Sequence, residues 1–328
     1  MVAAVCLASC LNNRAVAADL PTTAAEGAAG FLYRTNYHGW EESIWLSNGK
    51  VEAIIVPQVG RVMQFRLAGA EDGPFWENLE LIGKPTRPEG GEWLNFGGDR
   101  VWPAPQGSWP DIMETNWPPP VGFDGSAAQA VIDGWEVTLL YPADKKYGIR
   151  VTRHIQLAVD DPSMEIQTRF EKTDHPTMDV GIWVMTQLKE PLRVYARLQL
   201  TSLYPQGFLP MSDRLPPSLT IQDRLLSLDR DPRNPHKIGI DVGSVVWMTE
   251  DTVLKIDSPR LPYRAYPDDG ASALVYTNPD PEAYVELAML SPVRQLRVGG
   301  VITQRSTYTL LPRTELDPDL EAARLLKP

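Results

Sequence analysis

Short runs of alternating apolar and polar residues, separated by turn residues, recur along residues 43–311. Because side chains of a strand alternate between two faces, this period of two predicts β-strands. The clearest case spans residues 43–56, where Asn48-Gly49 separates two such runs and predicts a tight hairpin turn. Asp133-Gly134 predicts a second hairpin, and the turn at 160–163 predicts a third.

No stretch before the last dozen residues shows the 3.6-residue period of a helix. Residues 179–188 are mostly apolar and predict a strand buried on both faces. Many strands at regular spacing favour an all-β fold, and we expect a large antiparallel β-sandwich. We expect one domain over 31–313, followed by a short C-terminal helix or tail over 314–328 with Asp317 as its N-cap.

The N-terminus combines a short apolar run with a small-residue site, Ala15-Val16-Ala17, a pattern typical of a secretory signal. Leu7-Ala8-Ser9-Cys10 is also similar to a lipobox, in which Cys10 would be lipidated. We expect 1–18 to be a signal peptide or lipoprotein signal and 19–30 a linker, in an exported protein that is periplasmic or membrane-anchored. No Lys or Arg precedes the apolar run, so a misplaced start codon and a cytoplasmic tail stay open as alternatives.

Composition narrows the classes of partner. The net charge is −11 and no Lys/Arg-rich run occurs, which argues against a nucleic-acid partner and against adhesion to an anionic membrane surface. Both cysteines, Cys6 and Cys10, lie in the N-terminal segment, so the rest of the chain has no disulfide or Cys-based metal site. No apolar span is long enough to cross a bilayer. We expect a monomer without cofactor or metal.

Residues 95–120 read NFGGDRVWPAPQGSWPDIMETNWPPP. Proline fixes φ and removes a backbone donor, so we expect this segment to form neither a helix nor a central strand. Its tryptophan content argues against disorder. Gly97 and Gly98 permit a sharp bend before Asp99 and Arg100. These features predict a rigid functional loop at one end of the sandwich.

Four stretches, taken in chain order, carry a resemblance to a known family: VEAIIVPQVGRVMQFRLAG, NFGGDRVWPAPQ, TRHIQLAVDDPSMEIQTRFEKTDHPTMDVGIWVMTQL and AYVELAMLSPVRQLRVGGVITQRSTYTLLP. They resemble the galactose mutarotase-like (aldose 1-epimerase) superfamily over residues 31–312. The GGDR-x-WPAPQ loop is most similar to a bacterial branch whose members are often exported. The resemblance implies a β-supersandwich that binds a carbohydrate.

Mutarotation needs an acid and a base beside the sugar ring oxygen and the anomeric hydroxyl. The resemblance implies a His on a middle strand and a Glu near the closing strands. Glu286 matches the Glu, and the alternative is a surface carboxylate on an edge strand. Where the His is expected the chain reads Met185-Thr186-Gln187, none of which exchanges a proton near pH 7. His154, one strand earlier, is the second catalytic candidate, with a structural role as the alternative.

Polar and aromatic side chains of the loop are candidates for sugar binding. Asp99 and Arg100 suit sugar hydroxyls unless they form an internal clamp. Tryptophans offer apolar platforms for sugar rings, and we expect at least one of the three to be structural and at least one to face a cleft. The tryptophans are Trp102, Trp109 and Trp117, and the second-rank binding candidates are Arg61, Gln106, Trp183 and Gln187.

The first hypothesis is therefore an exported carbohydrate-binding protein, and, if it is an enzyme, an epimerase or mutarotase with Glu286 as base. A polysaccharide lyase or glycoside hydrolase on the same fold is the second. A non-catalytic domain of the cell envelope, in which the tryptophan loop only packs, is the third.

Overall fold

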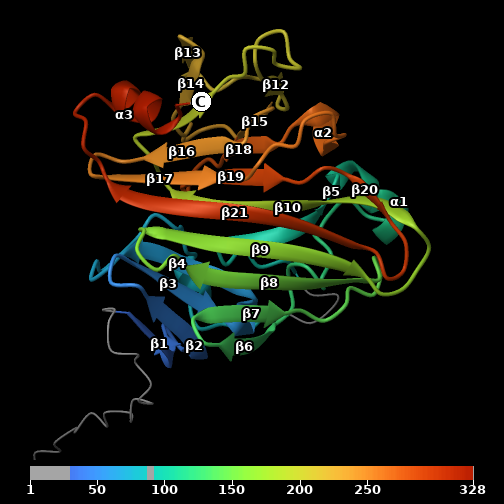
Figure 1. Ribbon diagram of the computed structural model, residues 1–328. Helices are drawn as coiled ribbons and strands as arrows, with labels where there is room; N and C mark the ends of the chain where they lie inside the picture. The colour runs from blue at the N-terminus through green and yellow to red at the C-terminus, as the bar shows by residue number, and fades with distance from the viewer. Residues whose placement is uncertain (1–29, 87–91, 328) are drawn as a thin grey trace, which may run out of the picture.

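A computed structural model describes residues 30–86 and 92–327, and within them nearly all strands belong to two large antiparallel sheets (Figure 1). The first sheet has the spatial order β1 (Phe31–Tyr37), β2 (Trp40–Ser47), β3 (Val51–Val56), β4 (Arg61–Leu67), β5 (Asp99–Ala104), β10 (Met178–Lys189), β19 (Tyr284–Leu290), β18 (Ala273–Thr277), β15 (His236–Ile240) and β12 (Leu209–Pro210), with β20 (Arg294–Leu296) paired to β10.

The second sheet has the order β13 (Thr220–Gln222), β14 (Leu225–Leu228), β11 (Arg193–Arg197), β16 (Ser244–Met248), β17 (Thr252–Asp257), β21 (Val301–Pro312), β9 (Ser163–Lys172), β8 (Ile149–Leu157), β7 (Glu136–Leu140) and β6 (Gln129–Asp133). Helical segments are short: η1 (Pro57–Val59), η2 (Leu79–Leu81), η3 (Gln106–Ser108), α1 (Trp109–Met113), α2 (Pro267–Gly270) and α3 (Pro318–Leu325). No helix in the described part of the chain is long and apolar enough to span a membrane.

The sequence predictions for fold class and hairpins are confirmed. Strands β2 and β3 pair around Asn48-Gly49, β6 and β7 around Asp133-Gly134, and β8 and β9 around the turn at 160–163. Strand β10 is buried along most of its length, as its apolar sequence predicts. Asp317 caps α3, accepting hydrogen bonds from the backbone N–H groups of Asp319 and Leu320. The predicted signal, including Cys10, lies outside the described residues.

The prediction for the proline-rich segment is wrong in two places. Strand β5 lies in the middle of the first sheet, between β4 and β10, and α1 is a one-turn helix that begins at Trp109. Within the described residues β4 pairs with β5 only at Val62 and Asp99, so the missing N–H of Pro103 falls where β5 has a partner on one side only. Pro110 occupies the first turn of α1, where its missing donor is not needed.

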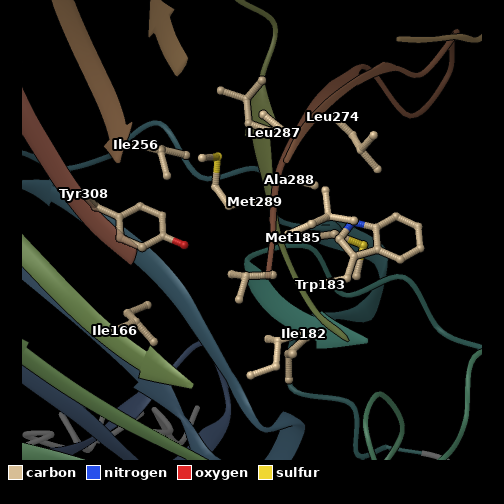
Figure 2. Close-up of a cluster of buried hydrophobic side chains, with 14 of the residues drawn as sticks. Ile166, Ile182, Trp183, Met185, Ile256, Leu274, Leu287, Ala288, Met289 and Tyr308 are labelled. Carbon is tan, nitrogen blue, oxygen red and sulfur yellow. The ribbon is translucent and has the colours of Figure 1, made fainter. Parts of the chain in front are cut away.

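The two faces of the first sheet have different surroundings. On the face turned toward the second sheet, Thr186 and Asp99 contact Tyr308 of β21. Because side chains alternate along a strand, the neighbours of these residues project from the opposite face. Figure 2 shows this division: Tyr308 and Ile256 of the second sheet lie on one side of the paired strands β10 and β19, and Trp183 lies on the other. We call the side turned away from the second sheet the outer face of the first sheet.

Candidate functional site

Polar side chains form a row across the outer face of the first sheet. Cross-strand register places Gln187 of β10 opposite Glu286 of β19, Glu286 opposite Tyr276 of β18, and Tyr276 opposite Lys237 of β15. Directly opposed residues of antiparallel strands project from the same face. The row continues through β5, because Arg100 Nη2 donates to Glu286 Oε2 at 3.0 Å. We call these five residues the outer-face row.

Glu286 is buried in this row. Its exposed fraction is 9%, and its strand has β10 on one side and β18 on the other. The sequence-based alternative, a surface carboxylate on an edge strand, is therefore wrong. Carboxylates are seldom this buried unless they are paired, and here the Arg100 guanidinium is the partner.

Asp124 holds the other side of Arg100. One of its oxygens accepts from Arg61, and the other lies 3.5 Å from Arg100 Nε and accepts from the indole N–H of Trp102 at 2.7 Å and of Trp93 at 3.1 Å. Burial by itself raises the pKa of the Asp124 carboxyl, but the charges of Arg61 and Arg100 and the two indole donors hold the pKa below its usual range. Asp124 is thus an ionised anchor that fixes two arginines and two tryptophans.

Trp102 is the centre of an aromatic cluster beside the row. Its ring lies 5.4 Å from that of Trp109, 5.8 Å from Trp117, 5.3 Å from Trp183 and 6.3 Å from Trp93, with edge-to-face geometry in each pair. Trp109 is fully buried, with its indole N–H bonded to the Pro103 carbonyl, whereas Trp117 remains 45% exposed. A hollow bordered by Trp93 reaches the Arg61–Asp124 pair.

Several buried polar atoms of the row, of the aromatic cluster and of the loop before β5 have no hydrogen-bond partner among the described residues. Gln187 is fully buried, yet neither Nε2 nor Oε1 of its amide is bonded. The same holds for Arg100 Nη1, the indole Nε1 of Trp183 and Asn95 Oδ1. Buried polar groups in native proteins are almost always paired, so these atoms need a partner that the described residues do not supply, either water or a ligand.

Tyrosines complete the surroundings of Glu286. Burial and the Glu286 charge raise the pKa of Tyr276 to about 12, and the same causes raise the pKa of Tyr284 further. Both hydroxyls therefore remain protonated at neutral pH. Lys237 Nζ lies 4.8 Å from the Trp183 ring centroid, as a cation over an aromatic face.

Glu77 is a partly buried carboxyl that contacts Tyr37 of β1 and Gln64 of β4 in the same sheet. Tyr37 OH donates to both of its oxygens, at 3.0 and 2.9 Å, and Gln64 Nε2 donates to one of them at 3.3 Å. Burial nevertheless raises the pKa of Glu77 to about 7, because no Arg or Lys forms an ion pair with it among the described residues.

The structure separates some residues that the sequence grouped together. Asp99 projects from the inner face, fully buried against Arg153, Thr186 and Tyr308. It therefore clamps the two sheets together and does not lie with the outer-face row. The alternative of an internal clamp between Asp99 and Arg100 is also wrong, because Asp99 forms its ion pair with Arg153.

His154 lies on the second sheet, with Nδ1 at 3.0 Å from both Glu136 and Thr138. Its neighbour Arg153 points between the sheets to Asp99, so His154 projects from the far side of the second sheet. All four histidines are in the described residues, and none belongs to the row.

The remaining candidates divide between the row, the aromatic cluster and the surface. Gln187, Trp183, Arg100 and Glu286 come together on the outer face, with Arg61 linked to them through Asp124. Gln106 is partly exposed in η3. The described residues contain no cluster of three His, Cys, Asp or Glu placed to hold a metal ion.

Sequence reasoning missed Tyr276, Lys237 and Trp93 altogether. Period-two alternation along residues 273–277 could have shown that Tyr276 and Leu274 share a face. It could not have shown which strand lies beside it.

Solved structures of other proteins share this arrangement of sheets. A galactose mutarotase-like protein from Lactobacillus casei superposes with a TM-score of 0.57 at 10% sequence identity, covering 82% of this chain and 100% of its own. The fold is that of the galactose mutarotase-like proteins. A candidate aldose 1-epimerase from Klebsiella pneumoniae has the same mutarotase-like fold, with a TM-score of 0.56, 13% identity and coverage of 92% of this chain and 87% of its own.

A galactose mutarotase related enzyme from Lactobacillus acidophilus is a third example, with a TM-score of 0.53, 10% identity and coverage of 82% and 97%. No protein-family model matches the chain, and no curated protein matches it. Likeness at this level of identity establishes the mutarotase-like fold, whereas the chemistry has to be argued from the side chains.

Proposed function

We propose that this protein is exported and binds a carbohydrate on the outer face of its first sheet, at the outer-face row. The observation that carries the proposal is the fully buried Gln187 amide, with both polar atoms unpaired, next to the Arg100–Glu286 pair. A sugar hydroxyl both donates and accepts, so it satisfies an amide donor, an amide acceptor and a carboxylate at once. The tryptophan cluster supplies the apolar surface that a sugar site requires.

Binding is favoured over turnover by the groups around Glu286. Arg100, Tyr276 and Tyr284 are titratable residues of the described part of the chain that interact with it. Arginine does not lose its proton in proteins, and the raised pKa of each tyrosine removes it from proton exchange near pH 7. If the site is catalytic, Glu286 is its base and anomer exchange is the reaction that this fold supports.

Two alternative functions are less well supported. A lyase acting on a uronate needs uncompensated positive charge, but Arg61 and Arg100 share Asp124 and Arg100 also pairs with Glu286. A purely structural tryptophan loop requires three buried rings, but Trp117 is 45% exposed.

Saturation-transfer NMR against a panel of neutral mono- and oligosaccharides tests the proposal, with anomer exchange followed in the same samples. Gln187→Leu removes both amide contacts and should weaken binding by roughly ten- to thirtyfold, from about 1 kcal/mol per hydrogen bond. The matched control is Gln304→Leu, a buried glutamine on β21 of the second sheet with an unpaired Oε1, which should leave binding unchanged. Absence of transfer to every sugar would refute the proposal.

Export rests on the N-terminal sequence pattern alone. Mass spectrometry of the mature protein from a bacterial host should find either a new N-terminus at Ala18 or a lipid on Cys10. An intact N-terminus in the cytoplasmic fraction would contradict export.

A further inference from the structure

A basic groove lies at the far side of the second sheet, bordered by Leu326 and Lys327, which follow α3. Figure 1 shows the place of α3 in the molecule. It has a volume of about 410 Å³, and four cationic side chains line it: Arg197, Arg224, Lys255 and Lys327. The chain as a whole carries a net charge of −11, so a concentration of positive charge here needs a physical explanation.

Strand register explains how the cations meet. Tyr195 of β11 pairs with Val246 of β16, and Val246 pairs with Lys255 of β17. Arg197 is two residues beyond Tyr195, so it projects from the same face as Lys255. Tyr195 bonds Asp319 of α3 at 2.8 Å, so this is the face on which α3 packs, away from the first sheet.

Arg224 reaches the groove from a strained turn. It follows Asp223 between β13 and β14, and both residues are left-handed, with φ of 63° and 49°. Such two-residue turns favour Gly, Asn and Asp, so the turn holds an arginine in a conformation that its side chain disfavours. Its Nη1 donates only to the Leu198 carbonyl, at 3.3 Å.

The two arginines lack acidic partners. Among the described residues no carboxylate lies within ion-pair distance of Arg197 or Arg224, and the Nε of Arg197 is buried without a hydrogen-bond partner. Lys255 is compensated, since Asp257 lies 3.0 Å from its Nζ. Neighbouring like charges repel, and an anion placed between them removes the repulsion and supplies acceptors for both guanidinium forks.

We propose that this groove binds a phosphate group, either on a small soluble molecule or on a lipid. Arginine pairs bind phosphate oxygens through parallel N–H donors, and a doubly charged phosphate monoester compensates two guanidinium groups better than a single carboxylate does. The groove is larger than inorganic phosphate requires and leaves room for an organic substituent. It lies on the other sheet from the outer-face row, so it is independent of the sugar site.

Titration of ¹⁵N-labelled protein with inorganic phosphate and with glycerol 3-phosphate tests the inference, at constant ionic strength set by chloride. Saturable shifts should appear at the backbone amides of Thr201, Gly243 and Ser244, which line the groove. Arg197→Gln should weaken binding at least tenfold, as expected for loss of charge-assisted hydrogen bonds. Arg193→Gln is the matched control, because Arg193 lies on the same strand and face but bonds Ser227 at 3.1 Å.

The Arg224→Gly variant shows whether a loss of phosphate binding could result from misfolding. Glycine accepts a left-handed conformation without strain, so this variant should unfold at the same or a higher temperature and still lose phosphate binding. Vesicles of phosphatidylglycerol and of phosphatidylcholine distinguish the two sources: binding to vesicles that needs Arg197 assigns the phosphate to a lipid headgroup. The inference would be overturned if neither soluble phosphates nor vesicles bind, or if binding survives both arginine substitutions.

Discussion

Replacing Asp124 by Asn removes the negative charge shared by Arg61 and Arg100 while leaving the shape of the side chain almost unchanged. Arg61 is 2% exposed and has no other acidic partner among the described residues, whereas Arg100 keeps Glu286. Removing one partner of a buried ion pair typically costs about 3–5 kcal/mol, because a buried charge is left uncompensated. We expect a loss of unfolding free energy in that range, dominated by Arg61.

For a domain of this size each kcal/mol lowers Tm by roughly 2–4 °C, so the Asp124→Asn variant should melt about 6–20 °C lower. Circular dichroism melts at pH 7 measure this. Glu42→Gln is the control, because the Arg34–Glu42 pair is exposed on both sides and should contribute under about 1 kcal/mol.

The Asp124 carboxylate also determines how the stability of the protein should change with pH. Its pKa is lowered on folding, so its stabilising contribution is present above the unfolded-state pKa and is lost as the pH falls through the folded-state pKa. The wild-type protein should therefore lose stability toward low pH more steeply than the variant. An Asp124→Asn protein that melts within 2 °C of wild type at pH 7 would refute this account of the buried pair.

Further predictions concern the other carboxyls and His154. Because folding raises the pKa of Glu77 from 4.5 to about 7, its ionisation destabilises the fold progressively from about pH 4.5 to 7 and in full above that, by up to about 3 kcal/mol. Glu77→Gln should therefore raise Tm at pH 7.5 but not at pH 4.5, and an equal shift at both would contradict this. Glu286→Gln should abolish any anomer exchange in an NMR assay and weaken sugar binding, whereas unchanged exchange would exclude Glu286 as the base. Asp99→Asn should lower Tm without altering the sugar affinity measured for the remaining folded protein. His154→Ala should change neither exchange nor affinity, and a loss of either would return His154 to the site.

The strand pattern was readable from the sequence because its hairpins depend on local signals. Asn48-Gly49 and Asp133-Gly134 predicted the positions of two turns. The alternation of apolar and polar residues predicted which side chains share a face of the sheet. Strand β5 was missed because prolines usually exclude a central strand. The rule failed because β5 lacks a ladder partner on one side near Pro103, which follows from the packing of distant segments.

The structure brings some of the candidate site residues together and separates others, according to the face from which each side chain projects. Glu286 and Gln187 were both candidates, and the structure places them opposite each other. Asp99 and Arg100 are adjacent in sequence and were taken together, yet alternation sends them to opposite faces of the sheet. His154 was a candidate because its strand was expected one strand before the strand of Gln187. It belongs to the other sheet, and only the pairing of strands distant in sequence decides in which sheet a strand lies.

The indole N–H signals in a ¹H–¹⁵N spectrum, recorded during titration with a sugar found by saturation transfer, test the central claim most directly. Among the tryptophans that border the row and its aromatic cluster, Trp183 has an unpaired indole N–H, whereas Trp109 donates to the Pro103 carbonyl. Trp247 on the second sheet serves as an internal control, since its indole N–H donates to the Lys189 carbonyl. The account predicts a saturable shift that is largest for Trp183 and negligible for Trp109 and Trp247. A saturable shift at Trp247 with none at Trp183 would place the sugar elsewhere and contradict it.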